Sequence, residues 1–270
     1  LINGEAQVSP PFCWGLIVKV RPRILKLPKY ESHRAQHDGD RFYSTPEGFM
    51  PSVTTVLRDD SKFKPWRKYV GEAEANRIMN EASKRGTWTH DSAENFLLTG
   101  EEPEFHYVYQ PWWKSIKPFL DVIDHTILTE GAVWNSDYYA GAFDCLCYLK
   151  DGINNGGDNE LIPDADSQQP VLVDFKTANK LIGGTKLYGY EKQCAAYVKA
   201  LNYVYRKEGL IVRQALIACA VPGCAVQLFD INRDDINQLY SHFLEQLEDW
   251  HDKHTIPETL KVNDDPNVSD

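Results

Sequence analysis

The hydrophobic pattern of this chain changes its period once, and that change limits the folds it can adopt. Residues 64–124 place apolar side chains at the spacing of amphipathic helices. From residue 125 onward, apolar and polar residues alternate in three runs, 125–134, 138–150 and 169–177, as they do in β-strands. The polar, Gly- and Asn-rich stretch 151–168 is expected to be a long hairpin loop. The order β-β-β-α-β-β-α of the latter half predicts an α/β fold with a central mixed β-sheet flanked by helices.

Composition and pattern divide the chain into four regions. Residues 1–60 are typical of short strands and turns, which indicates a β-rich N-terminal element. Residues 61–125 are typical of helices, with a break expected at Gly86. Residues 126–255 contain the predicted sheet and its helices, and residues 256–270 are predicted to be a disordered tail.

Charge is distributed unevenly along the 270 residues. The formal net charge is −10, which by itself argues against a polyanionic partner. Residues 1–70 nevertheless contain 12 Lys and Arg against 7 Asp and Glu. An acidic protein can therefore present one basic face, although a solvated surface explains the same excess.

The sequence predicts an intracellular protein with no membrane partner. No apolar run approaches the roughly 18 residues of a membrane span, and the start of the chain lacks the basic and apolar parts of an export signal. The six cysteines contain no C-x-x-C pair and are too sparse for a disulfide scaffold, so reduced thiols are expected. Because numbering begins at Leu1 rather than Met, a removed targeting peptide remains compatible with the sequence.

Two acids and a lysine interrupt the apolar strands. In YYAGAFDCLCYLK, alternation puts Asp144 on one face and Phe143 and Cys145 together on the other. In VLVDFKT, Asp174 and Lys176 share a face. If the two strands are neighbours in a hairpin, both carboxylates converge at one end of the sheet, beside the lysine.

Such a group of charges needs a compensating partner, because burial removes its hydration. Mg²⁺ or Mn²⁺ would provide one, since these ions prefer carboxylate oxygens and keep several waters. Asp144 and Asp174 would hold the ion, and Lys176 would act on the attacking water or on the phosphate. The pattern therefore favours phosphodiester hydrolysis, although a surface ion pair would explain the Asp-x-Lys motif alone.

Three motifs in order resemble the PD-(D/E)XK nuclease superfamily, in its RecB-like exonuclease branch. GAFD, then VDFKT thirty residues later, then QCAAY resemble the G-x-x-D, (D/E)-x-K and Q-x-x-x-Y motifs of that branch. RGTWTHDSAENFL resembles its upstream R-G-T-x-x-H motif. PSVTTVL followed by Trp-Arg is similar to a segment of mitochondrial genome maintenance exonucleases and their phage relatives. The matches run from about Tyr43 to Tyr197.

The resemblance implies a restriction-endonuclease-like core, with a helical insertion over the active site. It implies that Asp144 and Asp174 bind the metal ion and that Lys176 is the catalytic lysine. The backbone carbonyl of Phe175 would be a further metal ligand.

Four more residues receive roles from the resemblance. His90 matches the motif histidine close to the metal, where a single helical His is otherwise a core residue. Gln193 and Tyr197 lie one helical turn apart and would both point at the site, the alternative being a surface Gln and a core Tyr. Glu130 would be a supporting metal-binding acid, or else a plain strand-end residue.

The helical region 61–125 combines tryptophans with Lys and Arg, as single-stranded nucleic acid binding requires. The alternative is that the tryptophans fill helix interfaces. Within the family a helical arch admits a free single-stranded end, so this region is expected to form the substrate channel. The residues expected to bind substrate are Arg67, Lys68, Arg85, Trp88 and Lys114.

The combined expectation is a Mg²⁺- or Mn²⁺-dependent exonuclease that degrades single-stranded DNA in replication, recombination or repair. An endonuclease of the same superfamily and a non-catalytic nucleic-acid-binding protein remain alternatives. No iron–sulfur cluster is expected, because only Cys219 and Cys224 lie late in the chain. No ATP is expected, since a Walker motif is missing, so a helicase or recombination protein would be a separate partner. The resemblance implies a bacterial or phage-infected cytoplasm, or mitochondria.

Overall fold

The computed structural model describes residues 25–31, 33–150 and 169–261. The predicted hairpin loop 151–168 lies outside these residues, as do residues 262–270 of the predicted tail and residues 1–24 of the predicted β-rich N-terminal element. The described start, Leu25–Glu31, has no regular secondary structure, and it leads into a small sheet.

The small N-terminal sheet has three antiparallel strands in the order β1-β2-β3. Its strands are β1 (Arg34–His37), β2 (Asp40–Thr45) and β3 (Gly48–Pro51). A tight turn joins β2 to β3, since Thr45 stands opposite Gly48, and this agrees with the strands and turns expected in residues 1–60. A short helix, α1 (Val53–Val56), follows and is capped by Ser52, whose hydroxyl accepts from the N–H of Thr55.

The central sheet has five strands in the order β4-β5-β6-β7-β8, and it is mixed. Only β6 and β7 run parallel, and the other neighbours are antiparallel. The predicted alternating runs all became strands of this sheet. Its strands are β4 (Ile123–Asn135), β5 (Tyr139–Leu149), β6 (Val171–Thr177), β7 (Gln214–Ala220) and β8 (Gln227–Ile231).

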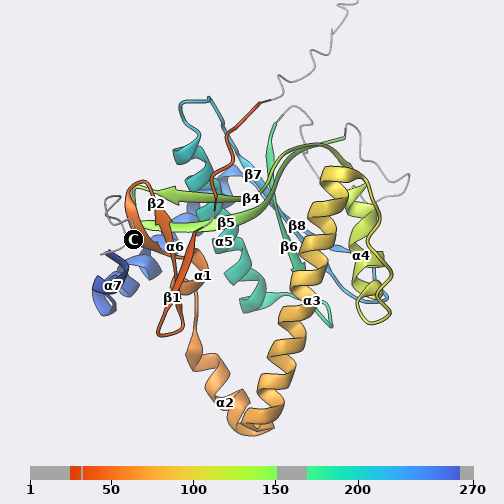
Figure 1. Cartoon of the computed structure of the whole chain (residues 1–270), viewed down its shortest axis with the longest axis horizontal. Coiled ribbons are helices and arrows are strands. Elements are labelled where there is room, and N and C mark those ends of the chain that lie inside the picture. The colour runs from red at the N-terminus through yellow and green to blue at the C-terminus, as the bar shows by residue number, and fades with distance from the viewer. Residues whose placement is uncertain (1–24, 32, 151–168, 262–270) are drawn as a thin grey trace, which may run out of the picture.

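Helices cover both faces of the central sheet, which confirms the predicted mixed α/β architecture (Figure 1). One buried cluster joins α3 and α4 to the sheet, and another joins α5 and α6 to the opposite face. The helix α6 buries Ile236, Leu239 and Phe243 at three- and four-residue spacing, as an amphipathic helix does. The helices are α3 (Glu72–Thr99), α4 (Gln110–Leu120), α5 (Gly184–Val204), α6 (Arg233–Lys253) and α7 (Glu258–Lys261).

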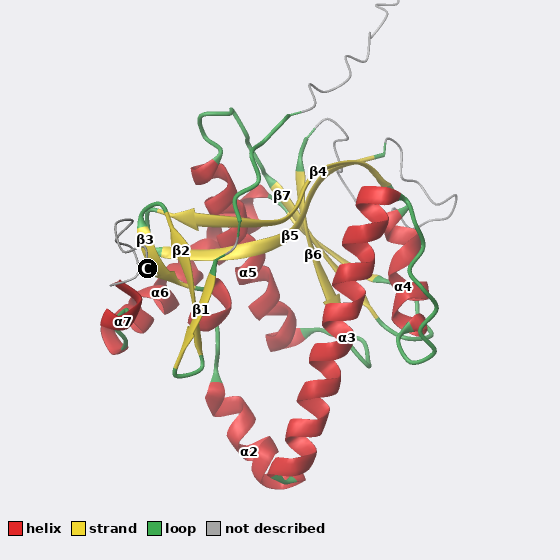
Figure 2. Cartoon of the chain, viewed as in Figure 1, coloured by secondary structure: helices red, strands yellow, loops and turns green. Residues whose placement is uncertain are grey.

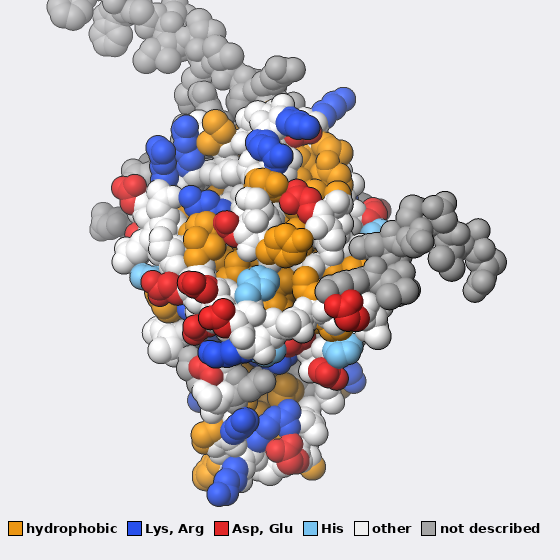
Figure 3. Space-filling model, turned by 90° about the vertical axis from the view of Figure 1, so that its left-hand side faces the viewer, with side chains coloured by type: hydrophobic (Ala, Val, Ile, Leu, Met, Phe, Trp, Pro, Cys, Tyr) orange, Lys and Arg blue, Asp and Glu red, His pale blue; other side chains and the backbone are white. Residues whose placement is uncertain are grey.

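The helical hairpin breaks at a different glycine from the one predicted. The helix α2 (Asp60–Val70) ends at Gly71, whose φ of 86° favours glycine, whereas α3 runs straight through Gly86. Gly86 has an ordinary helical backbone, and a Cβ there would meet only Thr177 Oγ1, at 4.0 Å. The resulting α2–α3 hairpin projects away from the sheet (Figure 2), and Lys and Arg side chains gather on it (Figure 3).

Strict alternation fails in β5 at one position. Cys145 and Cys147 pack towards α3 and α4, as one face requires, but Phe143 packs in the cluster that contains α5. Across the strand pair, Glu130 has a left-handed backbone with a φ of 47°, although the pairing of β4 with β5 keeps the same register on both sides of it. The prediction that Phe143 shares a face with Cys145 is therefore wrong.

No helix in residues 25–31, 33–150 and 169–261 is long and apolar enough to cross a membrane.

Candidate metal centre

The candidate site lies where β5 and β6 stop pairing. The two strands pair from Cys147 opposite Val171 to Cys145 opposite Val173, and their pairing ends there. Asp144 directly precedes Cys145 in β5 and lies just beyond the last pair. Its Oδ2 accepts a hydrogen bond from the N–H of Phe175 at 2.7 Å. A side chain thus satisfies a backbone donor that no longer has a strand partner on this side.

Asp174 and Lys176 occupy the same end of β6. The Asp174 residue is 1% exposed, and its Oδ2 forms an ion pair with Lys176 Nζ. Burial raises the pKa of Asp174 to about 6, against the opposing effect of the lysine. Burial would lower the pKa of Lys176, but the two aspartates raise it above its ordinary value, so the ammonium stays charged.

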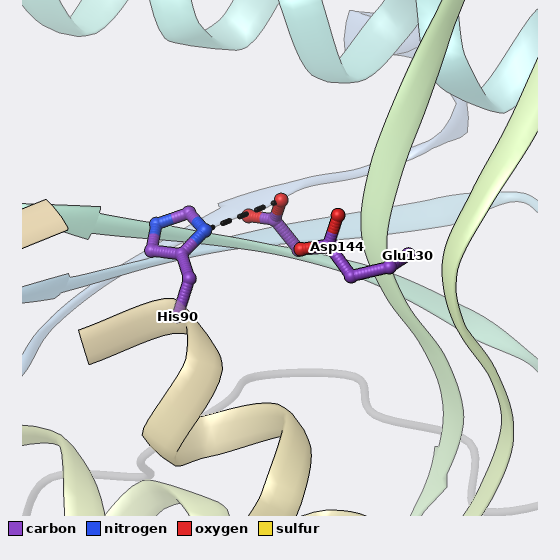
Figure 4. A group of neighbouring side chains, drawn as sticks. All are labelled: His90, Glu130 and Asp144. Atoms are coloured by element: carbon purple, nitrogen blue, oxygen red, sulfur yellow. Dashed lines mark ion pairs between the residues drawn. The ribbon is translucent and has the colours of Figure 1, made fainter. Parts of the chain in front are cut away.

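His90, Glu130 and Asp144 form a second part of the site. Each offers one ligand atom, and these atoms all lie within 4.8 Å of one another. Figure 4 shows His90 reaching from its helix towards Asp144, and the distance from Nδ1 to Oδ1 is 3.5 Å. Glu130 comes from β4, where it has a left-handed backbone with a φ of 47°.

Burial and mutual charge set the protonation of this group. Burial and the Asp144 carboxylate raise the pKa of Glu130 to about 7. Burial would lower the pKa of His90, but Asp144 raises it above its ordinary value. Burial likewise would raise the pKa of Asp144, yet His90, Lys176 and the Phe175 N–H lower it. A cation at this point would favour the ionised form of Glu130.

Gln193 and Tyr197 lie together on α5 and line the same cavity as Asp144. Gln193 Nε2 donates to Tyr197 Oη at 3.3 Å. The ring of Tyr197 needs space that only a glycine leaves, since a Cβ at Gly141 would stand 2.6 Å from its Cε1. This contact gives a physical reason for the glycine of GAFD.

The cavity has a volume of about 460 Å³, and walls from α3, the central sheet, α5 and the small N-terminal sheet. His90, Asp144 and Lys176 line it from α3, β5 and β6. Arg34 and Arg41 lie on the side formed by β1 and β2, and the sequence did not single them out. Only the basic excess of residues 1–70 pointed towards them.

None of the five residues expected to bind substrate lines this cavity. Arg67 lies on the projecting hairpin and pairs with Glu72, and Lys68 is exposed on the same helix. Arg85 is buried and donates to Thr177 and Asn179.

The other two of these residues lie near α4. Trp88 packs against the rings of His106 and Tyr109, at centroid distances of 5.7 and 5.8 Å. Lys114 lines a separate cavity of about 530 Å³ together with Phe105. Their roles in substrate binding stay predictions.

The residues of the site fit a divalent metal. Asp174 Oδ1 is buried without a hydrogen-bond partner among the described residues, and such an atom is costly to bury unless something binds it. The group formed by His90, Glu130 and Asp144 offers an imidazole nitrogen and two carboxylate oxygens, which are suitable ligands for Mg²⁺ or Mn²⁺. Asp174 is not part of that group, and its role as a metal ligand stays a prediction. The role of the Phe175 carbonyl stays a prediction.

Comparison with known proteins adds little to this geometry. No family model matches the sequence, and no curated protein matches it. The chain aligns with the crystal structure of SSO0001 over 76% of its own length and 77% of that chain, at 13% identity and with a TM-score of 0.39. A likeness at that level carries no argument about fold or function.

Proposed function

We propose that this protein is a metal-dependent DNA exonuclease that hydrolyses phosphodiester bonds of single-stranded DNA from a free end. The observation that carries the proposal is the convergence of Asp144, Asp174 and Lys176 where β5 and β6 separate. We further propose that the central sheet with α3 to α6 is a restriction-endonuclease-like core.

The carboxylates would act as metal ligands. Asp144 and Asp174 would hold the ion, with Glu130 and His90 beside them. A bound Mg²⁺ or Mn²⁺ would polarise the scissile phosphate and lower the pKa of a bound water. The phosphate's negative charge is repelled by an apo site that holds three carboxylates, so DNA binding and metal binding should depend on each other.

Lys176 would stabilise charge near the scissile phosphate. Its ammonium is held by Asp174 and stays protonated, so it is suited to neutralise the charge that develops on the phosphate oxygens. Lys176 lines the cavity, so its ammonium would stand beside a phosphate bound there. Gln193 and Tyr197 line the cavity as neutral hydrogen-bonding groups that would orient the attacking water or the strand.

The dimensions of the cavity support an unpaired strand as substrate. A volume of about 460 Å³ is in the range of pockets that enclose a small ligand. A single nucleotide at a strand end is of a size that such a cavity can hold. The projecting α2–α3 hairpin adds exposed Tyr69 and Lys68, a combination that suits stacking on bases and pairing with phosphates.

The test compares end-labelled linear single-stranded DNA with a covalently closed single-stranded circle, in Mg²⁺ or Mn²⁺ and in EDTA. We expect the wild type to degrade only the linear strand, and only with metal. The Lys176→Ala variant should be inactive, and Arg213→Gln, an exposed substitution outside the cavity, should retain activity.

Two results would replace the proposal. Cleavage of the circle would indicate an endonuclease. DNA binding without any cleavage at every metal concentration would indicate a nucleic-acid-binding protein.

A further inference from the structure

The basic side of the cavity is one face of the small N-terminal sheet. Arg34 stands directly opposite Tyr43 in the β1–β2 pair, and directly opposed residues point to the same face. Arg41 lies two residues before Tyr43 on β2, so it shares that face as well. All three residues line the cavity.

The backbone beneath these arginines is held firmly, while the guanidinium of Arg41 is left available. The Arg41 N–H donates to Thr55 Oγ1 at 2.9 Å, and the Arg41 carbonyl accepts from the Ser52 N–H at 2.8 Å. Among the described residues, no hydrogen bond or ion pair involves its guanidinium. Arg58, which follows α1, instead donates to the carbonyl of Gly39 in the turn between β1 and β2, at 2.7 Å.

Arg34 interacts with Tyr43 in its own sheet and with the charge of Glu130 in the carboxylate cluster. Its guanidinium carbon lies 5.8 Å from the centre of the Tyr43 ring, an arrangement that fixes the side chain without neutralising it. Its charge also reaches Glu130 across the cavity, where it acts against the burial that raises the pKa of that carboxyl. Arg34 and Arg41 are therefore cations facing a carboxylate cluster across one cavity.

A metal ion on the carboxylates would change the balance of charge in this cavity. The carboxylates would then be neutralised, and the two arginines would remain as positive charges on the opposite side. One arginine guanidinium can donate two parallel hydrogen bonds to two oxygens of the same phosphate. Arginine is therefore well suited to bind a phosphate group. A ligand with two phosphates would place one at the metal-bound carboxylates and the other at the two arginines.

We propose that Arg34 and Arg41 bind a second phosphate of the single strand, next to the scissile phosphate at the carboxylates. This inference rests on the proposed function, and it assigns to the N-terminal sheet the task of holding the strand in register. Phosphate contacts of this kind position a strand without reading its sequence, so the enzyme accepts any base at this point.

The experiment is a thermodynamic cycle between protein and DNA, measured by fluorescence anisotropy in Mg²⁺. The Lys176→Ala background prevents cleavage of the labelled strand. One phosphate at a time is replaced by a neutral methylphosphonate, and each DNA is titrated with and without Arg41→Gln. We expect Arg41→Gln to weaken binding about tenfold, and one or two methylphosphonate positions to weaken it equally. Combining the two changes should bring no further loss.

Three controls make the cycle specific. Arg41→Gln should lower the slope of log affinity against log salt by about one, and Arg41→Lys should restore that slope but only part of the affinity. Arg213→Gln removes the same charge outside the cavity and should show no coupling to any phosphate. If Arg41→Gln melts at a lower temperature than the wild type, the measurement is repeated with Arg34→Gln.

The outcomes separate this inference from the proposed function. Independent losses at every methylphosphonate position, for both arginines, would overturn the second phosphate site even if the wild type cleaves DNA. Coupling in the cycle, together with a wild type that cleaves no DNA, would retain the phosphate site and overturn the proposed nuclease activity.

Discussion

The two sides of the cavity differ in how the chain builds them. The acidic side comes from neighbouring strands of the central sheet, where the loss of pairing between β5 and β6 brings Asp144 to the backbone of Phe175. The basic side comes from a separate sheet that ends more than seventy residues earlier in the chain. The first arrangement follows from a hairpin, and the second depends on the packing of one sheet against another.

The acidic side should control the rate of the reaction. Asp174→Asn keeps the shape of the side chain but removes its charge, so we expect about a 1000-fold loss in single-turnover cleavage at saturating DNA. The measurement is a rapid-quench time course in Mg²⁺, with Arg213→Gln as the control variant. A loss below tenfold would mean that Asp174 only anchors Lys176.

Metal should stabilise the protein through the acidic side alone. Mn²⁺ at one hundred times its Kd should add about 2.7 kcal/mol to the free energy of unfolding, because it binds the folded state. Asp144→Asn should lose most of this gain, whereas Arg41→Gln should keep it. The readout is thermal unfolding with and without the ion. An equal gain in wild type and Asp144→Asn would place the metal elsewhere.

The space beside Tyr197 should be sensitive to a single methyl group. Gly141→Ala would drive a Cβ to 2.6 Å from the Tyr197 ring, and we expect it to destabilise the protein by about 1–3 kcal/mol. Gly189→Ala is the matched control, because a Cβ there meets nothing within 4 Å and the site lies inside α5. Urea unfolding of both variants gives the comparison. Equal stability of the two would show that the ring moves aside freely.

The last prediction concerns Glu130 and pH. Its pKa is about 7 in the folded state against an ordinary value of 4.5, so the unfolded chain releases this proton first and stability falls as pH rises between these values. Without metal, Glu130→Gln should therefore be more stable than wild type at about pH 8 and no more stable at about pH 4.

Urea unfolding in EDTA at both pH values tests this expectation. Addition of Mg²⁺ should remove the advantage of Glu130→Gln, because the ionised carboxyl of the wild type then binds the ion. An advantage of the same size at both pH values would mean that the substitution acts through packing, independently of the charge.

Local pattern predicted most of the central sheet. The alternating runs became β4, β5 and β6, and the hairpin assumption correctly made β5 and β6 antiparallel neighbours. The hairpin assumption also placed Asp144 at the Asp174 end of β6, where its Oδ2 accepts from the Phe175 N–H.

Other features depend on contacts that a single stretch of sequence does not contain. The break between α2 and α3 falls at Gly71 because of its left-handed backbone, while Gly86 tolerates a helix. The packing of Phe143 in the cluster that contains α5 has no sign in the alternation of its own strand. Arg41 became a cavity residue only through the docking of the small sheet, since its neighbours in the sequence give no sign of what it faces.

The position of β6 affects how the protein loses activity when it is heated. This strand is the middle strand of the central sheet, and it pairs with β7 along its whole length, from Val171 to Thr177. Helices cover both faces of the sheet. Amide protons in such a strand exchange with solvent only when the whole molecule opens. Asp174 and Lys176 therefore sit in the last unit to come apart, so heat inactivation and global unfolding should occur together, unlike in enzymes whose reacting groups stand on surface loops.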